Sequence, residues 1–134
     1  MEDANDSGIR GYRDLRVWQK AMDIAVLTYS ISKSFPRDEI FGLTSQARRA
    51  AASVAANIAE GYGRGTRPAY ISFLRISQGS LKDLETHMML AVRVGITESK
   101  AVDHLLSEAD HLGRMLRTLL KKLASSAPIP SPKP

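Results

Sequence analysis

The stretch FGLTSQARRAAASVAANIAEGYGRG, residues 41–65, decides the fold of this chain. Thr44 is of a type that caps helix N-termini, and the glycines after Glu60 are of the type that ends helices, so the stretch predicts one helix from Thr44 to Glu60. At about 100° per residue, small and apolar side chains cover two adjoining sides of it. One side carries Leu43, Ala47, Ala50, Val54, Ile58 and Gly61, and the other carries Ala51, Ala52, Ala55, Ala56 and Ala59. Because a surface helix of a monomer has one apolar stripe, we expect this helix to contact both its own bundle and a neighbouring subunit.

The composition predicts one globular domain without disulfides. The chain has 134 residues, of which 43% are apolar, and it contains no cysteine. It is therefore long enough for a core of its own, and thiolate metal sites are excluded. The N-terminal residues show no basic segment followed by an apolar run, so no secretory signal is predicted. No apolar run reaches the roughly 20 residues of a membrane span, and we expect a cytoplasmic protein.

Three further helices are predicted from the periodicity of apolar residues. The first runs from Asp14, as its cap, to about Ser34, and two apolar strips follow it about half a turn apart. The strip expected to face inward is Leu15, Trp18, Met22, Ala25, Val26 and Tyr29, and the second is Val17, Ile24, Thr28, Ile31 and Phe35. The third helix runs from Pro68 to Val94 after a Thr66 cap, and the fourth from Glu98 to Ala124.

Short links between four helices favour an antiparallel up-down-up-down four-helix bundle. We expect this all-α bundle to span residues 12–124. A polar leader precedes it over residues 1–11, and a proline-rich tail follows it over residues 125–134. Both flanking segments are expected to be mobile.

Four segments carry a resemblance to a known family: YRDLRVWQKAMDIA from Tyr12, SFPRDEIFGLTSQARRAAASVAANIAEGYGR from Ser34, AYISFLRISQGSLKDLETHMMLAVRVG from Ala69, and LGRMLRTLLKKL from Leu112. Over residues 12–124 the chain resembles the bacterial four-helix-bundle proteins encoded within intervening sequences of 23S ribosomal RNA genes. The resemblance implies a left-handed antiparallel bundle that assembles into a ring, typically a homopentamer. A related branch, the accessory protein of diversity-generating retroelements, is a basic pentameric barrel that works with a reverse transcriptase and nucleic acid. The family usually has proline near position 55, where this chain has Ala55, so we expect a straighter helix.

The charge of the chain permits a polyanionic partner. The formal net charge is +5, and residues 48–75 contain five arginines and one acid. Guanidinium groups match phosphate geometry well, and contacts with phosphates dominate nucleic-acid affinity. The candidate RNA-binding residues are Arg48, Arg49, Arg64, Arg67 and Arg75.

A structural interpretation of the same polar stripe stands beside the functional one. Asn57 and Glu60 lie on the stripe that begins at Arg49, because helical neighbours are three and four residues apart. With Glu85 of the third helix they are expected to form a polar network that closes the bundle or a subunit interface. Glu85 lies close to the inward stripe, so it is expected to pair with an arginine.

The remaining polar residues favour neither catalysis nor metal binding. The loop GYGRGTR lacks both the GK[ST] ending of a phosphate-binding P-loop and the strand that precedes one. His104 and His111 are seven residues apart, whereas helical metal ligands are usually four apart. We therefore expect a non-enzymatic homo-oligomer, without cofactor or metal, that binds RNA through its arginines. The alternative is a protein–protein adaptor that binds no nucleic acid.

Overall fold

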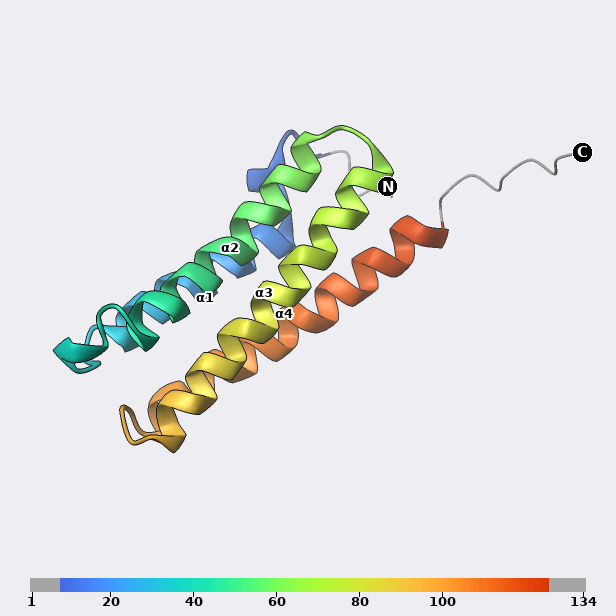
Figure 1. Ribbon diagram of the computed structural model, residues 1–134. Coiled ribbons are helices and arrows are strands. Elements are labelled where there is room, and N and C mark those ends of the chain that lie inside the picture. Colours follow the sequence, from blue (N-terminus) through green and yellow to red (C-terminus); the bar gives the residue numbers. More distant parts are fainter. Residues whose placement is uncertain (1–7, 126–134) are drawn as a thin grey trace, which may run out of the picture.

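The computed structural model describes residues 8–125, and this part of the chain contains four long helices and no strand (Figure 1). The elements are η2 (Tyr12–Asp14), α1 (Arg16–Ser32), η3 (Arg37–Glu39), α2 (Leu43–Gly63), α3 (Arg67–Arg93) and α4 (Ser99–Ser125). The prediction of an all-α fold with four helices is confirmed. Most of the predicted leader and tail, residues 1–7 and 126–134, lies outside the described residues.

The helices α2 and α3 pack antiparallel along most of their length. The Ser77 hydroxyl donates to the Val54 carbonyl at 2.9 Å, and a Cβ added to Gly61 would lie only 2.6 Å from the Cβ of Phe73. Contacts that move forward along α2 thus move backward along α3. The helix α2 was expected to end at Glu60, but it continues through Gly61 to Gly63. The missing side chain of Gly61 lets the two helices approach closely.

The start of α2 differs from the prediction. The helix begins at Leu43, one residue before the expected cap, and Thr44 is buried without a side-chain capping bond. The carboxylate of Glu39 takes the place of the expected cap, because its Oε1 accepts a hydrogen bond from the first backbone N–H of the helix, that of Leu43, at 3.0 Å. An acid at this place also suits the positive end of the helix dipole.

The predicted caps of the first and third helices have different outcomes. Asp14 is not the cap of α1, since its carboxylate accepts from the backbone N–H of Arg10 at 2.8 Å and α1 begins two residues later. Thr66 is the cap of α3, as predicted: its hydroxyl accepts from the Ala69 N–H at 3.3 Å. Both outcomes depend on which backbone donor the short polar side chain reaches.

The face of α1 that packs in the core is the opposite of the predicted one. The buried residues of α1 are Val17, Ala21, Ile24, Thr28 and Ser32. The strip expected to face inward is partly open to solvent, with Met22 exposed by 40%, Val26 by 66% and Tyr29 by 47%. On α3 and α4 the buried leucines follow the helical repeat, and they include Leu74, Leu81, Leu84, Leu105, Leu112 and Leu116.

Candidate functional site

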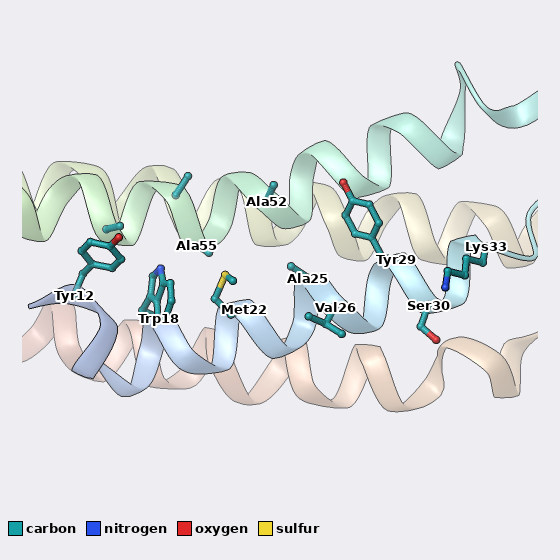
Figure 2. Close-up of a pocket in the computed structure, with 12 residues that line it drawn as sticks. Tyr12, Trp18, Met22, Ala25, Val26, Tyr29, Ser30, Lys33, Ala52 and Ala55 are labelled. Carbon is teal, nitrogen blue, oxygen red and sulfur yellow. The ribbon is translucent and has the colours of Figure 1, made fainter.

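An apolar groove runs along the surface between α1 and α2 (Figure 2). Its volume is about 650 Å³. Its lining is formed by Tyr12, Trp18, Met22, Ala25, Val26, Tyr29, Ser30, Lys33, Ala52, Ala55, Ala56 and Ala59. Nine of these twelve residues belong to the two apolar surfaces that the sequence placed against the core or a neighbour. The structure thus leaves open one of the two packing faces of each helix.

The shape of the groove follows from a size difference between its walls. On the α2 wall every lining residue is alanine, whereas α1 supplies a tryptophan, a methionine and a tyrosine. At one end the rings of Tyr12 and Trp18 meet edge to face, with centroids 5.3 Å apart. Small residues on one wall leave room for side chains of a partner. The sequence signal for this groove is the strip of α1 that contains Trp18, Met22 and Tyr29, which the periodicity places in the core.

At the other end of the groove, Arg48 of α2 reaches across to α1. Its Nε donates to the Ser32 hydroxyl at 2.8 Å, and its guanidinium carbon lies 4.5 Å from the centroid of the Tyr29 ring. Arg48 is half-buried by these contacts, whereas the next residue, Arg49, is exposed. The two neighbouring arginines therefore differ in how freely they can meet a ligand.

The other three candidate arginines lie at or beyond the connection between α2 and α3. Arg64 pairs with Glu60 at 2.8 Å and lies 5.0 Å from the centroid of the Phe73 ring. Within residues 8–125, no carboxylate lies in ion-pair range of Arg67 or Arg75. Arg48 and Arg64 are sixteen residues apart, about 24 Å along a helix. The five candidates consequently do not form one patch on a single chain.

The predicted polar network of Asn57, Glu60 and Glu85 is divided into separate contacts. Asn57 donates to the backbone carbonyl and hydroxyl of Ser53, at 2.9 and 3.0 Å, and that hydroxyl lies 2.8 Å from the Ser80 hydroxyl of α3. Within residues 8–125, the ion-pair partner of Glu60 is Arg64, the residue that follows α2. The expected network therefore joins α2 to α3 through serines and not through acids.

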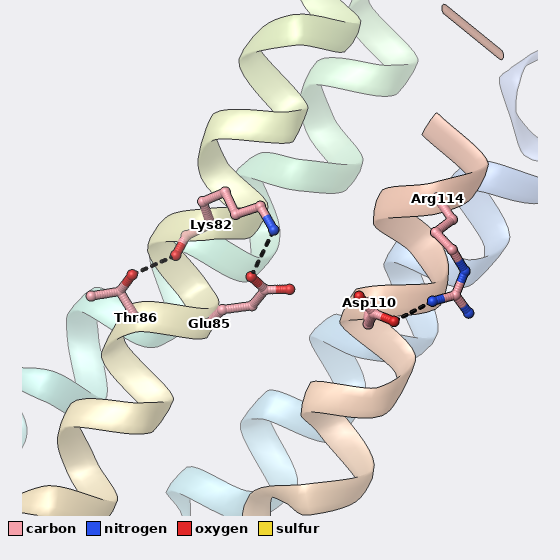
Figure 3. A network of polar contacts seen from close by, with 5 residues as sticks. All are labelled: Lys82, Glu85, Thr86, Asp110 and Arg114. Carbon is pink, nitrogen blue, oxygen red and sulfur yellow. Dashed lines mark hydrogen bonds and ion pairs between the residues drawn. The ribbon is translucent and has the colours of Figure 1, made fainter. Parts of the chain in front are cut away.

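The prediction that Glu85 pairs with an arginine is wrong. Its partner is Lys82, one turn earlier on α3, at 3.2 Å (Figure 3). On α4, Asp110 and Arg114 form a separate ion pair. A side chain exposed by only 14% thus has a local ion-pair partner, because the lysine reaches along its own helix.

Among the described residues, Tyr70 and Glu108 have shifted pKa values, and the two side chains do not form a pair. Burial, with a smaller contribution from Tyr62, raises the pKa of Tyr70 to about 12. The Lys20 ammonium donates to Glu108 at 2.6 Å, and this hydrogen bond lowers the pKa of that carboxyl. In the described part of the chain, no three acidic or histidine side chains converge to hold a metal ion. No helix there is long and apolar enough to span a membrane.

Four long helices and an open apolar groove between α1 and α2 define an all-α protein with one candidate binding surface. The chain belongs to the 23S rRNA-intervening sequence protein family, which it matches over residues 13–118. A similar fold occurs in a crystal structure of a protein with unknown function from the S23 ribosomal protein family of Bacteroides thetaiotaomicron, with a TM-score of 0.70 and 20% sequence identity. The match covers 78% of this chain and 98% of the other. No curated protein sequence matches the chain at a significant level.

Proposed function

We propose that the protein is a non-enzymatic, self-assembling four-helix bundle that binds RNA through exposed arginines. The observation that carries this proposal is the state of Arg49, Arg67 and Arg75. All three lack an ion-pair partner within residues 8–125, in a segment that contains only one acid. A guanidinium group without a carboxylate keeps its donors available for phosphate oxygens.

Self-assembly is the second part of the proposal, and the groove supports it. A second copy of the chain is the proposed occupant, which would give each α2 helix a second packing surface. Phe41, which is 92% exposed, lies outside the groove. Contact between Phe41 of one copy and the groove of the next would be heterologous, the kind of contact that closes rings. A ring of five up-down-up-down bundles, as the family resemblance implies, is the proposed form.

The RNA part is tested by fluorescence anisotropy with a labelled hairpin and a labelled random single strand. The test variant is Arg49→Gln/Arg67→Gln/Arg75→Gln. The control, Lys20→Gln/Lys82→Gln/Arg114→Gln, removes the same charge from cations that already have carboxylate partners. At ~150 mM salt we expect the test variant to lose about tenfold in affinity and the control about threefold or less. Equal affinities of the test variant and the unmodified protein would contradict the proposal.

The groove also favours a second candidate function, an adaptor that binds another protein. An adaptor would keep its groove open in the absence of that partner, so it would remain monomeric at the concentrations used for binding. A monomer that ignores both RNAs at ~150 mM salt would support the adaptor and exclude the RNA-binding scaffold. Light scattering of the same samples distinguishes the two candidates.

A further inference from the structure

Within residues 8–125, the excess positive charge is confined to one half of the bundle. We define this basic half as residues 8–20, 60–75 and 108–125, which contain eleven lysines and arginines and four acids. The rest of the described chain, residues 21–59 and 76–107, contains seven of each and is therefore balanced. Salt screens charges beyond about 8 Å at physiological ionic strength, so this local excess matters more than the net charge.

The fold brings three distant stretches of sequence into this half. In Figure 1 the segment around η2, the connection between α2 and α3, and the C-terminal end of α4 lie toward the same end of the molecule. The ion pair of Lys20 with Glu108, at 2.6 Å, joins α1 to α4. Across the connection, the rings of Tyr62 and Tyr70 meet edge to face, with centroids 5.7 Å apart. The charges therefore gather through the topology and do not form a run in the sequence.

Seven of the eleven cations of the basic half have no ion-pair partner within residues 8–125. Within residues 8–125, ion pairs bind Lys20, Arg64 and Arg114. The cations of this half without an ion-pair partner in the described residues are Arg10, Arg13, Arg16, Arg67, Arg75, Arg117 and Lys121. The start of α3 adds the partial positive charge of a helix N-terminus beside Arg67. Seven such cations from three helices and an adjoining segment leave a surface that attracts a chain of closely spaced phosphates.

We infer that the basic half binds the phosphate backbone of RNA, with Arg16, Arg67 and Arg117 among the contacts. The inference rests on the proposed RNA-binding function and narrows it. It adds arginines from both ends of the chain to Arg67 and Arg75, and it leaves out Arg48, which contacts Tyr29 and Ser32 of α1. Contacts of this kind carry no base readout, so the site is expected to accept RNA of any sequence.

Two variants with the same change of net charge test the location of the site. Arg16→Gln/Arg67→Gln/Arg117→Gln removes three cations from the basic half, and Arg37→Gln/Arg93→Gln/Lys100→Gln removes three from the balanced half, outside the groove. All six residues are exposed or half-buried and have no ion-pair partner in the described chain. At ~150 mM salt we expect about a tenfold loss of single-strand RNA affinity for the first variant and about threefold or less for the second. Equal losses would overturn the inference.

Two further measurements keep the result interpretable. Circular dichroism shows whether each variant is folded, and Arg117→Gln/Lys121→Gln, confined to the exposed side of α4, repeats the test if the triple variant is not. Inorganic polyphosphate serves as a probe without bases or sugars. Binding of polyphosphate but not RNA, lost in the basic-half variant, would support the basic half and contradict the RNA function. RNA binding that both variants weaken equally would support the RNA-binding function and contradict its location in the basic half. Binding of neither RNA nor polyphosphate would contradict both the function and the location.

Discussion

The guanidinium carbon of Arg48 lies 4.5 Å from the centroid of the Tyr29 ring, so that α2 holds a side chain of α1 at the rim of the groove. The same arginine donates to the buried Ser32, whose hydroxyl in turn donates to the carbonyl of Thr28 at 2.8 Å. Arg48 is therefore engaged in joining two helices, although the sequence marks it as a candidate for phosphate binding. This contact gives Arg48 a structural role that its neighbour Arg49 lacks.

We expect Arg48→Ala to lower the free energy of unfolding by about 1–2 kcal/mol, because it removes a cation–π contact and a charge-assisted hydrogen bond. Arg49→Ala removes the same charge from an exposed position and should change stability by less than about 0.5 kcal/mol. Urea unfolding of both variants measures the difference. Equal stabilities of the two variants would show that the contact with Tyr29 and Ser32 contributes nothing.

The close approach of α2 and α3 predicts opposite effects for one chemical change at two glycines. Gly61→Ala places a methyl group 2.6 Å from the Cβ of Phe73, so it should destabilise the protein by about 1–3 kcal/mol through overpacking. Gly79→Ala, within α3, meets nothing within 4 Å and should stabilise it by about 0.5–1 kcal/mol, since alanine favours helix. Thermal unfolding followed by circular dichroism gives both signs. A stable Gly61→Ala variant would contradict the packing described here.

Periodicity in the sequence predicted the helices well but not which face of α1 is buried. α4 has one apolar stripe, so its orientation was unambiguous. α1 has two, and the more aromatic strip with Trp18 and Tyr29 was assigned to the core. The buried strip includes Thr28 and Ser32, whose hydroxyls donate to the carbonyls four residues earlier, at 2.8 Å in each case. These local bonds make burial of the hydroxyls acceptable, and no spacing in the sequence reveals them.

Only the part of the candidate site that lies in one continuous stretch of sequence was predictable. The arginines near the α2–α3 connection form a visible run in the sequence, and Arg67 and Arg75 indeed lack carboxylate partners in the described chain. Arg16 and Arg117 lie 101 residues apart in sequence and join the same half only through the packing of α1 and α4. The partner of Glu85 was also out of reach, since Lys82 and several arginines were equally plausible by charge alone.

Self-assembly through the groove predicts a sharp effect of one buried charge. Val26→Glu should convert the assembly to monomers, because an isolated carboxylate would be desolvated against the apolar wall of a second copy. Val94→Glu makes the same change outside the groove, at a valine exposed by 58% where Val26 is exposed by 66%, and should leave the assembly intact. Light scattering coupled to gel filtration measures the masses. An assembly that survives Val26→Glu would contradict docking in the groove.

Tyr70 predicts a loss of stability at alkaline pH. Its pKa is raised from 10.0 to about 12, mainly by burial, so the folded state favours the neutral phenol. This contribution is fully present below about pH 10 and is lost as the pH rises toward about 12. We expect urea unfolding to show a smaller fall in stability from about pH 9 to about pH 11 for Tyr70→Phe than for the unmodified protein. Parallel falls would show that Tyr70 titrates normally.

RNA binding by exposed arginines is tested most directly by the salt dependence of affinity in the unmodified protein. Each phosphate contact with a single strand contributes about −0.7 to the slope of log K against log salt concentration. Contacts from Arg49, Arg67 and Arg75 alone predict a slope of about −2, and the full basic half predicts a steeper one. Anisotropy titrations between ~50 and ~200 mM salt should therefore show a linear fall at least that steep. Absent binding, or an affinity that does not change with salt, would contradict RNA binding through these arginines.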